Sequence, residues 1–283
     1  MAVCYKVNHL THYAYGERVP GSHHLAHLAP RQTAWQQVRA YGLRISPEPT
    51  EQRSGADWFG NDYTWFALAG PHDRLEVEAT SEVEVASQTA AWRAAGEWDR
   101  PPEHANPLDA EYRLPSPAVP LLREAEAFAR QSFAPGRSLA DALEELAIRT
   151  QREFTYDPDA TSVTASVTEL LRSRRGVCQD FSHFLLSGLR SLGFAARYMS
   201  GYVAPLADGA AQTGAAASHA WVAVRAPDGN WIGCDPTNGK LADDEFVTLA
   251  WGRDFGDVTP LRGVIMARGS HRLQVAVTVV RQP

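Results

Sequence analysis

Prolines gathered between residues 101 and 120 divide this chain into two parts of different character. The stretch contains Pro101, Pro102, Pro107, Pro115, Pro117 and Pro120. Because proline lacks a backbone N–H and has a fixed φ angle, this stretch excludes both a continuous helix and a central strand. We therefore interpret residues 91–120 as a linker or crossing segment that separates residues 1–90 from residues 121–283.

The first part is expected to form β-structure. Residues 5–15 and residues 76–85 both alternate polar side chains with apolar or aromatic ones, which is typical of strands whose side chains point to opposite faces. Turn-forming sequences lie between them, at residues 46–49 (Ser-Pro-Glu-Pro) and 60–62 (Gly-Asn-Asp). We expect residues 1–90 to form an antiparallel β-domain.

The second part combines helices with strands. Residues 121–133 are expected to be helical, and residues 166–173 to form a shorter helix. Ser138 is placed to cap a further helix, with Asp141 at its third position. The β-rich residues 273–280 either rejoin the first sheet or extend the second part, and we group them with residues 121–283. The expected fold class is α+β.

Composition narrows the classes of protein that this chain can belong to. Its 283 residues are 44% hydrophobic, which is enough for at least one full core. The net charge of −6 argues against a nucleic-acid partner. The sequence contains no signal peptide and no segment near the ~18 apolar residues of a membrane helix. With three widely spaced cysteines and no disulfide framework, we expect a cytoplasmic protein with no membrane partner. The oligomeric state is not indicated.

Cys178 is the first position that indicates chemistry. Apolar residues follow it at helical spacing, namely Phe181, Leu185, Leu189 and Leu192. Gly193 is a natural C-terminal cap for this helix. Cys178 would then lie in the first turn, where the positive end of the helix dipole favours a thiolate. Gly176 would let a substrate or a backbone segment approach closely. The alternative is a structural cysteine packed at a helix start.

A predicted hairpin carries the next two positions. Residues 226–230, Ala-Pro-Asp-Gly-Asn, fit a type I turn followed by a glycine bulge. This loop would pair position 226 with 230, 221 with 235 and 219 with 237. Strand alternation then places His219, Trp221 and Asp235 on one face, with His219 and Asp235 as diagonal neighbours.

These residue types fit a nucleophile, a base and an orienting carboxylate. Cys178 would attack an amide or ester carbonyl, His219 would transfer the proton to the leaving amine, and Asp235 would hold the imidazole. The backbone N–H of Cys178 is an expected oxyanion donor at the helix start. Tyr156 is a candidate for the second donor, with a core aromatic as the alternative.

The motifs Gly-Val-Cys-Gln-Asp-Phe (residues 176–181), Ser-His-Ala-Trp-Val (218–222) and Asp-Pro-Thr-Asn-Gly (235–239) resemble the bacterial branch of the transglutaminase-like superfamily. The resemblance implies a papain-like core, in which a helix bearing Cys178 packs on an antiparallel sheet with His219 and Asp235. Residues 57–61 resemble the β-rich N-terminal domain that accompanies this core in bacteria, and residues 252–260 resemble the segment that follows it. One departure is His27, which stands where the family often has arginine before Leu-x-Pro; this puts in doubt an anchoring role for that arginine.

Residues near these motifs also suggest two other roles, in metal binding and in substrate attraction. A metal site would draw on Cys178, Asp180, His183, His219 and Cys234. However, metal-binding spacings such as C-x-x-C are absent from the sequence, and the hairpin register places Cys234 on the face opposite His219. We expect no metal, and no calcium-binding loop or other cofactor is indicated. Arg174 and Arg175 form either a solvated face or a site that attracts an acidic substrate group.

The predicted function is a thiol-dependent acyl-transfer enzyme that hydrolyses peptide, isopeptide or amide bonds of a peptide or protein substrate. Its first alternative is a protein-glutamine amine transferase, in which an amine rather than water resolves the acyl-enzyme. The three proposed catalytic residues do not distinguish the two, because the difference lies in water exclusion and acceptor binding. A second alternative is a peptide-binding protein that keeps the fold without turnover.

Overall fold

The structure is a computed structural model that describes residues 2–99, 107–158, 166–205, 212–213, 217–265 and 270–282. Residues 100–106 of the predicted linker, including Pro101 and Pro102, lie outside the described residues. The described part of the linker region contains two short helical elements, α1 (Thr89–Ala94) and the 3-10 helix η1 (Pro107–Arg113). Neither element is a long helix or a central strand.

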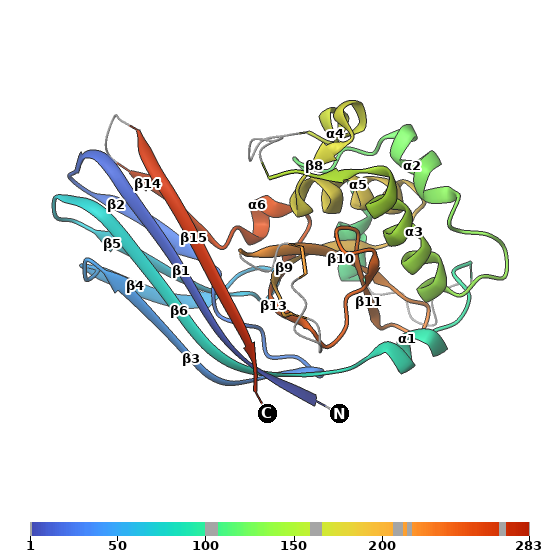
Figure 1. The fold of residues 1–283 in the computed structure, drawn as a ribbon, viewed down its shortest axis with the longest axis horizontal. Coiled ribbons are helices and arrows are strands. Elements are labelled where there is room, and N and C mark those ends of the chain that lie inside the picture. The colour runs from blue at the N-terminus through green and yellow to red at the C-terminus, as the bar shows by residue number, and fades with distance from the viewer. Residues whose placement is uncertain are drawn as a thin grey trace.

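The N-terminal part forms two antiparallel four-stranded sheets (Figure 1). The first has the order β15 (His271–Arg281), β1 (Ala2–Val19), β6 (His72–Ala86) and β3 (Gln36–Ser46). The second has the order β14 (Leu261–Ile265), β2 (Ser22–Ala26), β5 (Asp62–Leu68) and β4 (Glu51–Ala56). Tyr5, Val7 and His9 are buried along one face of β1, as strand alternation requires. The predicted antiparallel β-domain is present.

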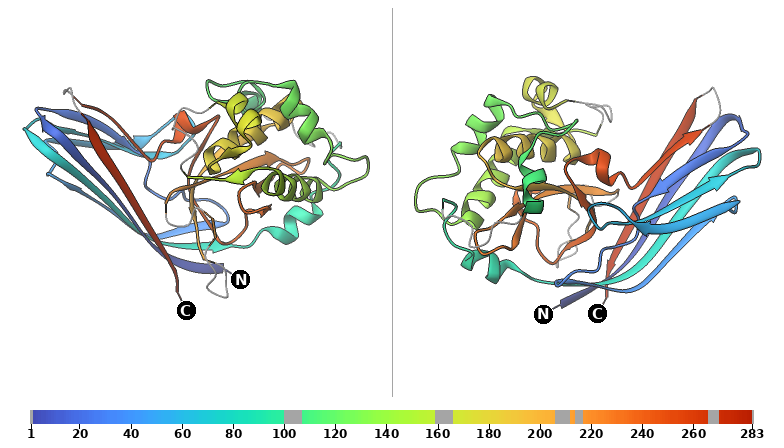
Figure 2. Two further views of the ribbon diagram at one scale, coloured as in Figure 1. Left: turned by 45° about the horizontal axis from the view of Figure 1, so that its top comes forward. Right: turned by 180° about the vertical axis from the view of Figure 1, so that it is seen from behind.

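Strands from the C-terminal end complete both of these sheets. β15 pairs with β1 over the whole stretch from Tyr5↔Arg281 to Tyr15↔His271, and β14 pairs with β2. Val277 and Val279 are buried, so β15 contributes apolar side chains to the face that Tyr5 and Val7 bury. The two ends of the chain therefore lie side by side (Figures 1 and 2). The sequence left open whether the last strand rejoins the first sheet or extends the second part. Residues 271–281 rejoin the first sheet, whereas the predicted grouping placed them with residues 121–283.

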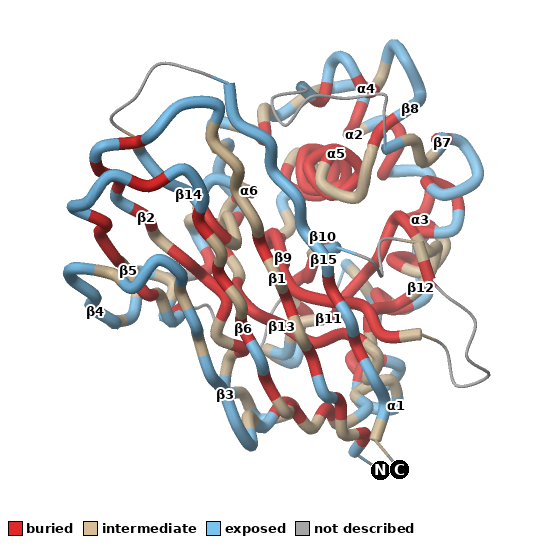
Figure 3. The backbone as a smooth tube through the Cα atoms, turned by 60° about the vertical axis from the view of Figure 1, so that its left-hand side comes forward, coloured by how far each residue is buried: buried red, intermediate tan, exposed pale blue. Residues whose placement is uncertain are grey.

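The core is a five-stranded sheet covered by helices. Its strand order is β12 (Lys240–Leu241), β11 (Trp231–Asp235), β10 (His219–Arg225), β9 (Ala196–Val203) and β13 (Phe246–Gly252). The helices are α2 (Arg123–Arg130), α3 (Leu139–Glu153), α4 (Val167–Ser173), α5 (Cys178–Ser191) and α6 (Phe255–Val258). A short parallel pair, β7 (Thr155–Tyr156) and β8 (Arg175–Gly176), lies before α5. Figure 3 shows α5 buried along most of its length.

Two of the helices begin where their sequences predict. The Ser138 hydroxyl accepts the Asp141 backbone N–H at the start of α3, and the Ser166 hydroxyl accepts the Glu169 backbone N–H at the start of α4. Each hydroxyl satisfies one of the backbone N–H groups that a helix start leaves without an intrahelical acceptor. None of the helices in the described part of the chain is long and apolar enough to cross a membrane.

Polar contacts join the first sheet to the core. The Gln36 side chain, which is fully buried, donates to the Thr248 carbonyl at 2.8 Å and accepts the Thr248 N–H at 2.7 Å, as a neighbouring strand would. Arg31 stacks 3.5 Å above the Trp251 ring and hydrogen-bonds Asn61. The His27 Nδ1–H donates to the Thr259 backbone carbonyl at 3.2 Å. The position where the family often has arginine thus still contacts the segment after the core.

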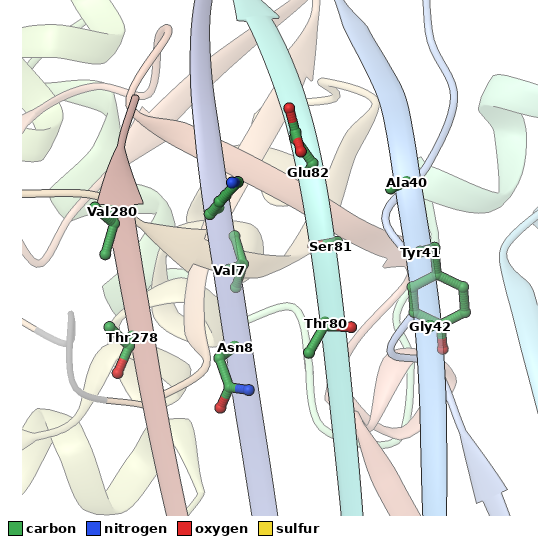
Figure 4. Close-up of a pocket in the computed structure, with 11 residues that line it drawn as sticks. Val7, Asn8, Ala40, Tyr41, Gly42, Thr80, Ser81, Glu82, Thr278 and Val280 are labelled. Atoms are coloured by element: carbon green, nitrogen blue, oxygen red, sulfur yellow. The ribbon is translucent and has the colours of Figure 1, made fainter. Parts of the chain in front are cut away.

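The outer face of the first sheet carries a shallow hollow of about 510 Å³ (Figure 4). Ala40 and Gly42 on β3 lie on one side of it, and Thr278 and Val280 on β15 lie on the other. The small residues of β3 leave room there because their side chains do not rise above the sheet. This hollow is remote from α5 and the hairpin.

Candidate active site

Helix α5 places Cys178 at its first position. Val177 is the N-cap, and its backbone N–H donates to the Asp180 carboxylate at 2.9 Å. The helix ends at Ser191, and Gly193 follows the C-cap with a left-handed φ of 90°. The Gly193 N–H donates to the Arg190 carbonyl, and the Phe194 N–H donates to the Leu189 carbonyl. This is the Schellman pattern that the glycine predicts. The helix is thus fixed at both ends, while Cys178 stays partly exposed.

The hairpin has the register that its loop predicts. Val222 pairs with Cys234 and Arg225 with Trp231. The Ala226 N–H donates to the Asn230 carbonyl at 2.8 Å, and Gly229 has a φ of 90°, as a glycine bulge requires. The predicted placement of His219 and Asp235 as diagonal neighbours on one face is confirmed.

His219 and Asp235 form a fully buried pair. The His219 Nε2 atom lies 2.8 Å from Asp235 Oδ2, and neither side chain has exposed surface. The other ring nitrogen, Nδ1, has no hydrogen-bond partner at normal distance among the described residues. Cys178 interacts with the same ring. The imidazole therefore lies between a carboxylate and a thiol, in the order that a base and its orienting group require.

The surroundings of His219 favour its charged form. Burial alone lowers the pKa of His219, but the charge and hydrogen bond of Asp235, followed by the interaction with Cys178, outweigh burial and raise it. A protonated His219 next to a thiol stabilises the thiolate, which is the nucleophilic form of cysteine. The helix start adds to this effect because its N–H groups carry partial positive charge.

Asp235 is held by groups that the sequence did not single out individually. Its Oδ1 accepts the Thr237 N–H at 2.8 Å, and its Oδ2 accepts from the Asn238 side-chain amide at 2.7 Å. Burial raises the pKa of Asp235, but His219, Asn238 and Thr237 together lower it below the ordinary value. The available signal for Asn238 was its position in the Asp-Pro-Thr-Asn-Gly motif, three residues after the carboxylate.

Aromatic rings surround the thiol and the imidazole. Trp221 stacks beside His219 at a centroid distance of 6.2 Å and meets Phe246 edge-on at 5.2 Å. Tyr156 and Tyr198 both interact with Cys178: burial first, and then the charge of a Cys178 thiolate, raises the pKa of each phenol. Tyr156 is partly exposed, whereas Tyr198 on β9 is fully buried against His183 of α5. Tyr198 was not identified from the sequence.

The close approach at Gly176 comes from the protein itself. A Cβ at this position would lie 2.8 Å from the Asp180 carboxylate and 2.9 Å from Leu170. The neighbours are therefore two side chains of the adjoining helices. Gly176 lets β8 pass close to α5, and so helps to place Cys178 after it.

Cys234 and His183, two of the candidate metal ligands, bind other groups than Cys178 and His219. Cys234 points away from His219 and donates to the Leu143 carbonyl of α3 at 3.2 Å. His183 accepts the Phe255 N–H at 3.2 Å, and burial lowers its pKa to about 4. Nowhere in the described ranges do three His, Cys, Asp or Glu side chains gather as a metal would require.

Arg175 pairs with Asp157, and Arg174 lies 4.7 Å over the Phe154 ring.

Two protein-family descriptions match parts of this chain. The bacterial transglutaminase-like N-terminal region matches residues 5–84, and the transglutaminase-like superfamily matches residues 126–236. An uncharacterized protein of Mycobacterium tuberculosis is 34% identical over 98% of this chain and 92% of its own length. Another, from Mycobacterium leprae, is 32% identical over 98% of both chains.

A crystal structure shows the same fold. It is that of a candidate cysteine protease from Cytophaga hutchinsonii, and it aligns with 100% of this chain and 92% of its own, with a TM-score of 0.79 at 18% identity. One family accounts for the fold of both parts, the two matched regions and the mycobacterial relatives. The chain therefore belongs to the transglutaminase-like superfamily, with a bacterial transglutaminase-like N-terminal region ahead of its papain-like core.

Proposed function

We propose that this protein is a thiol-dependent enzyme that hydrolyses peptide, isopeptide or related amide bonds through a covalent acyl-enzyme. The observation that carries the proposal is the buried His219–Asp235 pair, with 2.8 Å between Nε2 and Oδ2, whose imidazole also interacts with Cys178 at the start of α5. Cys178 is the proposed nucleophile, His219 the base and then the acid, and Asp235 the orienting group.

The proposed reaction has two halves. The Cys178 thiolate attacks the carbonyl carbon, and the protonated His219 gives its proton to the departing amine, which leaves a thioester on Cys178. Water then attacks the thioester carbonyl and gives a proton to His219. The acid product leaves, and the Cys178–His219 pair is restored. The developing oxyanion is expected to accept the Cys178 backbone N–H, with the Tyr156 hydroxyl as the proposed second donor.

Hydrolysis is favoured over amine transfer by the exposure of the thiol. Cys178 is partly exposed, so water can reach an acyl group on its sulfur. A transferase must exclude water until an amine arrives. The same exposure is compatible with an extended peptide lying across the start of α5.

The test compares wild type with Cys178→Ala on a peptide library that contains glutamine-bearing and general sequences, with an amine acceptor in half of the samples. Products are identified by mass. Cleaved peptides that disappear in Cys178→Ala are the expected result. A mass gain of acceptor minus ammonia would instead identify a transferase. If neither product depends on Cys178, even though a thiol-directed probe labels that residue, the hydrolase proposal fails for these substrates.

A further inference from the structure

Arg197 is a buried cation in an unusual setting. It lies on β9, on the sheet face that also carries His219 and Trp221, and is only 4% exposed. Its guanidinium lies 4.1 Å from the centroid of the Trp231 ring and 3.8 Å from that of Trp251. Stacking on indole rings stabilises a guanidinium, but it supplies no negative charge.

The charge of Asp109 acts on Arg197 from beyond ion-pair distance and only partly offsets the effect of burial. In the described part of the chain, no carboxylate lies within ion-pair distance of Arg197, and its Nε has no hydrogen-bond partner. Asp109, which lines a cavity next to Arg197, pairs with Arg225 at 3.1 Å. An uncompensated buried charge is costly, because burial removes its hydration.

A second, partly buried arginine adds to the positive charge. Arg31 stacks on Trp251 at 3.5 Å, and the bonds found for it among the described residues go to the neutral oxygens of Phe59 and Asn61. Burial lowers the pKa of Arg31 to about 10 and that of Arg197 to about 9. Both remain cations near neutral pH, and the positive charge of Arg31 also lowers the pKa of Arg197.

A cavity of about 190 Å³ adjoins Arg197. Five aromatic side chains line it, namely Trp58, Phe59, Tyr112, Trp231 and Trp251. They come from the N-terminal part, the linker region and the core sheet. Two acidic side chains also line it, Asp109, which Arg225 binds, and Glu111, which accepts the Trp58 Nε1–H at 3.0 Å. These carboxylates disfavour a ligand with several negative charges.

We propose that this cavity binds a small organic monocarboxylate, whose carboxylate pairs with Arg197 and whose flat or apolar body lies among the aromatic side chains. Guanidinium and carboxylate have matching geometry for paired hydrogen bonds. The site is separate from the thiol, because Arg197 pairs with Ala223, four residues along β10 from His219, or about 13 Å. The buried Trp221 and Phe246 fill the space between them. The carboxylate can belong to a free small molecule or to the end of a peptide.

The test is calorimetric titration of the whole chain with sodium benzoate, at constant ionic strength, with neutral benzamide as the matched ligand. We expect benzoate to bind at least about tenfold more tightly than benzamide. Arg197→Met should weaken benzoate binding by about tenfold or more. Arg53→Met is the control variant, because Arg53 also approaches a tryptophan ring, Trp65 at 6.0 Å, but is exposed and paired with Glu51.

Trp58→Ala keeps the proposal testable if Arg197→Met does not fold. Trp58 lines the cavity and is 74% exposed, so its truncation should weaken benzoate binding with little effect on stability. A phenylalanine-terminated peptide, as free acid and as amide, distinguishes the source of the carboxylate. Binding of the peptide acid but not its amide identifies a peptide end, and binding of benzoate alone identifies a free molecule. Equal binding of benzoate and benzamide, no benzoate binding, or unchanged binding in Trp58→Ala and any folded Arg197→Met would overturn the proposal.

Discussion

The three cysteines lie in different environments, and this difference can be measured residue by residue. Burial, together with the nearby Glu82 and Glu84 carboxylates, raises the pKa of Cys4. Burial raises that of Cys234 far more. Cys178 instead lies at a helix start beside His219, whose own pKa is raised. A thiol in such a setting is expected to be more nucleophilic than the other two.

We therefore expect iodoacetamide at about pH 6 to modify Cys178 and to leave Cys4 and Cys234 unmodified. Peptide mapping by mass spectrometry gives the extent at each cysteine. His219→Gln removes the imidazolium and should slow labelling of Cys178 toward the rate of an ordinary thiol. Equal labelling of Cys178 and Cys4 at this pH would contradict the thiolate–imidazolium pair.

Asn238 offers a second test at the residue scale, through pH. Its amide is one of the groups that lower the pKa of Asp235. The carboxylate therefore contributes stability that is present above its unfolded pKa of about 3.9 and is lost as pH falls through the lower folded value. Asn238→Ala raises the folded pKa of Asp235, so this loss should be smaller and should be complete at a higher pH.

The expected result for Asn238→Ala is that the acid limb of the kcat/KM profile moves to higher pH. The factor by which kcat/KM falls should be smaller near neutrality than at acidic pH. The matched control is Asn230→Ala, because the Asn230 amide also donates to a carboxylate, that of Asp228 at 2.8 Å, but on the exposed hairpin loop. An unchanged acid limb in Asn238→Ala would show that His219 and Thr237 hold Asp235 without it.

At the scale of elements, the close packing of β9 fixes the position of the imidazole. Gly201 on β9 pairs with His219 on one side and with Thr248 of β13 on the other. A Cβ at Gly201 would overlap the Val247 carbonyl oxygen and lie 2.7 Å from the Trp221 ring. Because Gly201 has no side chain, Trp221 can lie next to His219.

Gly201→Ala is expected to lower the free energy of unfolding by about 1–3 kcal/mol, because the backbone or Trp221 must shift. Activity should fall by more than the loss of folded protein explains, since His219 moves with β10. Gly70→Ala is the control, because no atom lies within 4 Å of an added Cβ there. Denaturant unfolding and kcat measure the two effects, and equal stability of the two variants would refute the packing argument.

Local elements could be predicted from the sequence because their signals are local. The Ser138 cap, the loop at residues 226–230 and the Cys178 helix all depend on residues a few positions apart, and the structure confirms each one. The pairing of β15 with β1 could not be predicted, because alternation identifies a strand but not its partner. The same limit applies to Arg197, for which the described residues supply no ion-pair partner, because its surroundings come from three distant segments.

At the scale of the whole molecule, side chains rather than strands connect the first sheet to the core. The Gln36 side chain forms three hydrogen bonds, two with the Thr248 backbone and one with the Arg31 carbonyl at 2.8 Å. It is fully buried, so water cannot replace these bonds. Because β13 carries Thr248 next to the Gly201 region of β9, this contact also supports the site.

Gln36→Ala should therefore destabilise the protein by about 1–3 kcal/mol for each backbone group left without a partner. Gln37→Ala, one residue further along β3 and exposed, should change stability by less than about 0.5 kcal/mol. Denaturant unfolding with a probe in each part of the molecule is the measurement. Similar midpoints for the two variants would show that the joint does not depend on Gln36.

The side-by-side position of β1 and β15 has a consequence for synthesis. About 250 residues separate the end of β1 from the start of β15, which a ribosome takes about 12–50 s to translate. During this time β1 can pair with β6, but its other edge has no partner strand. An unpaired edge is a template for association with other chains. The nascent protein therefore passes through a stage with an open sheet edge, which closes only after the core containing Cys178 has been made.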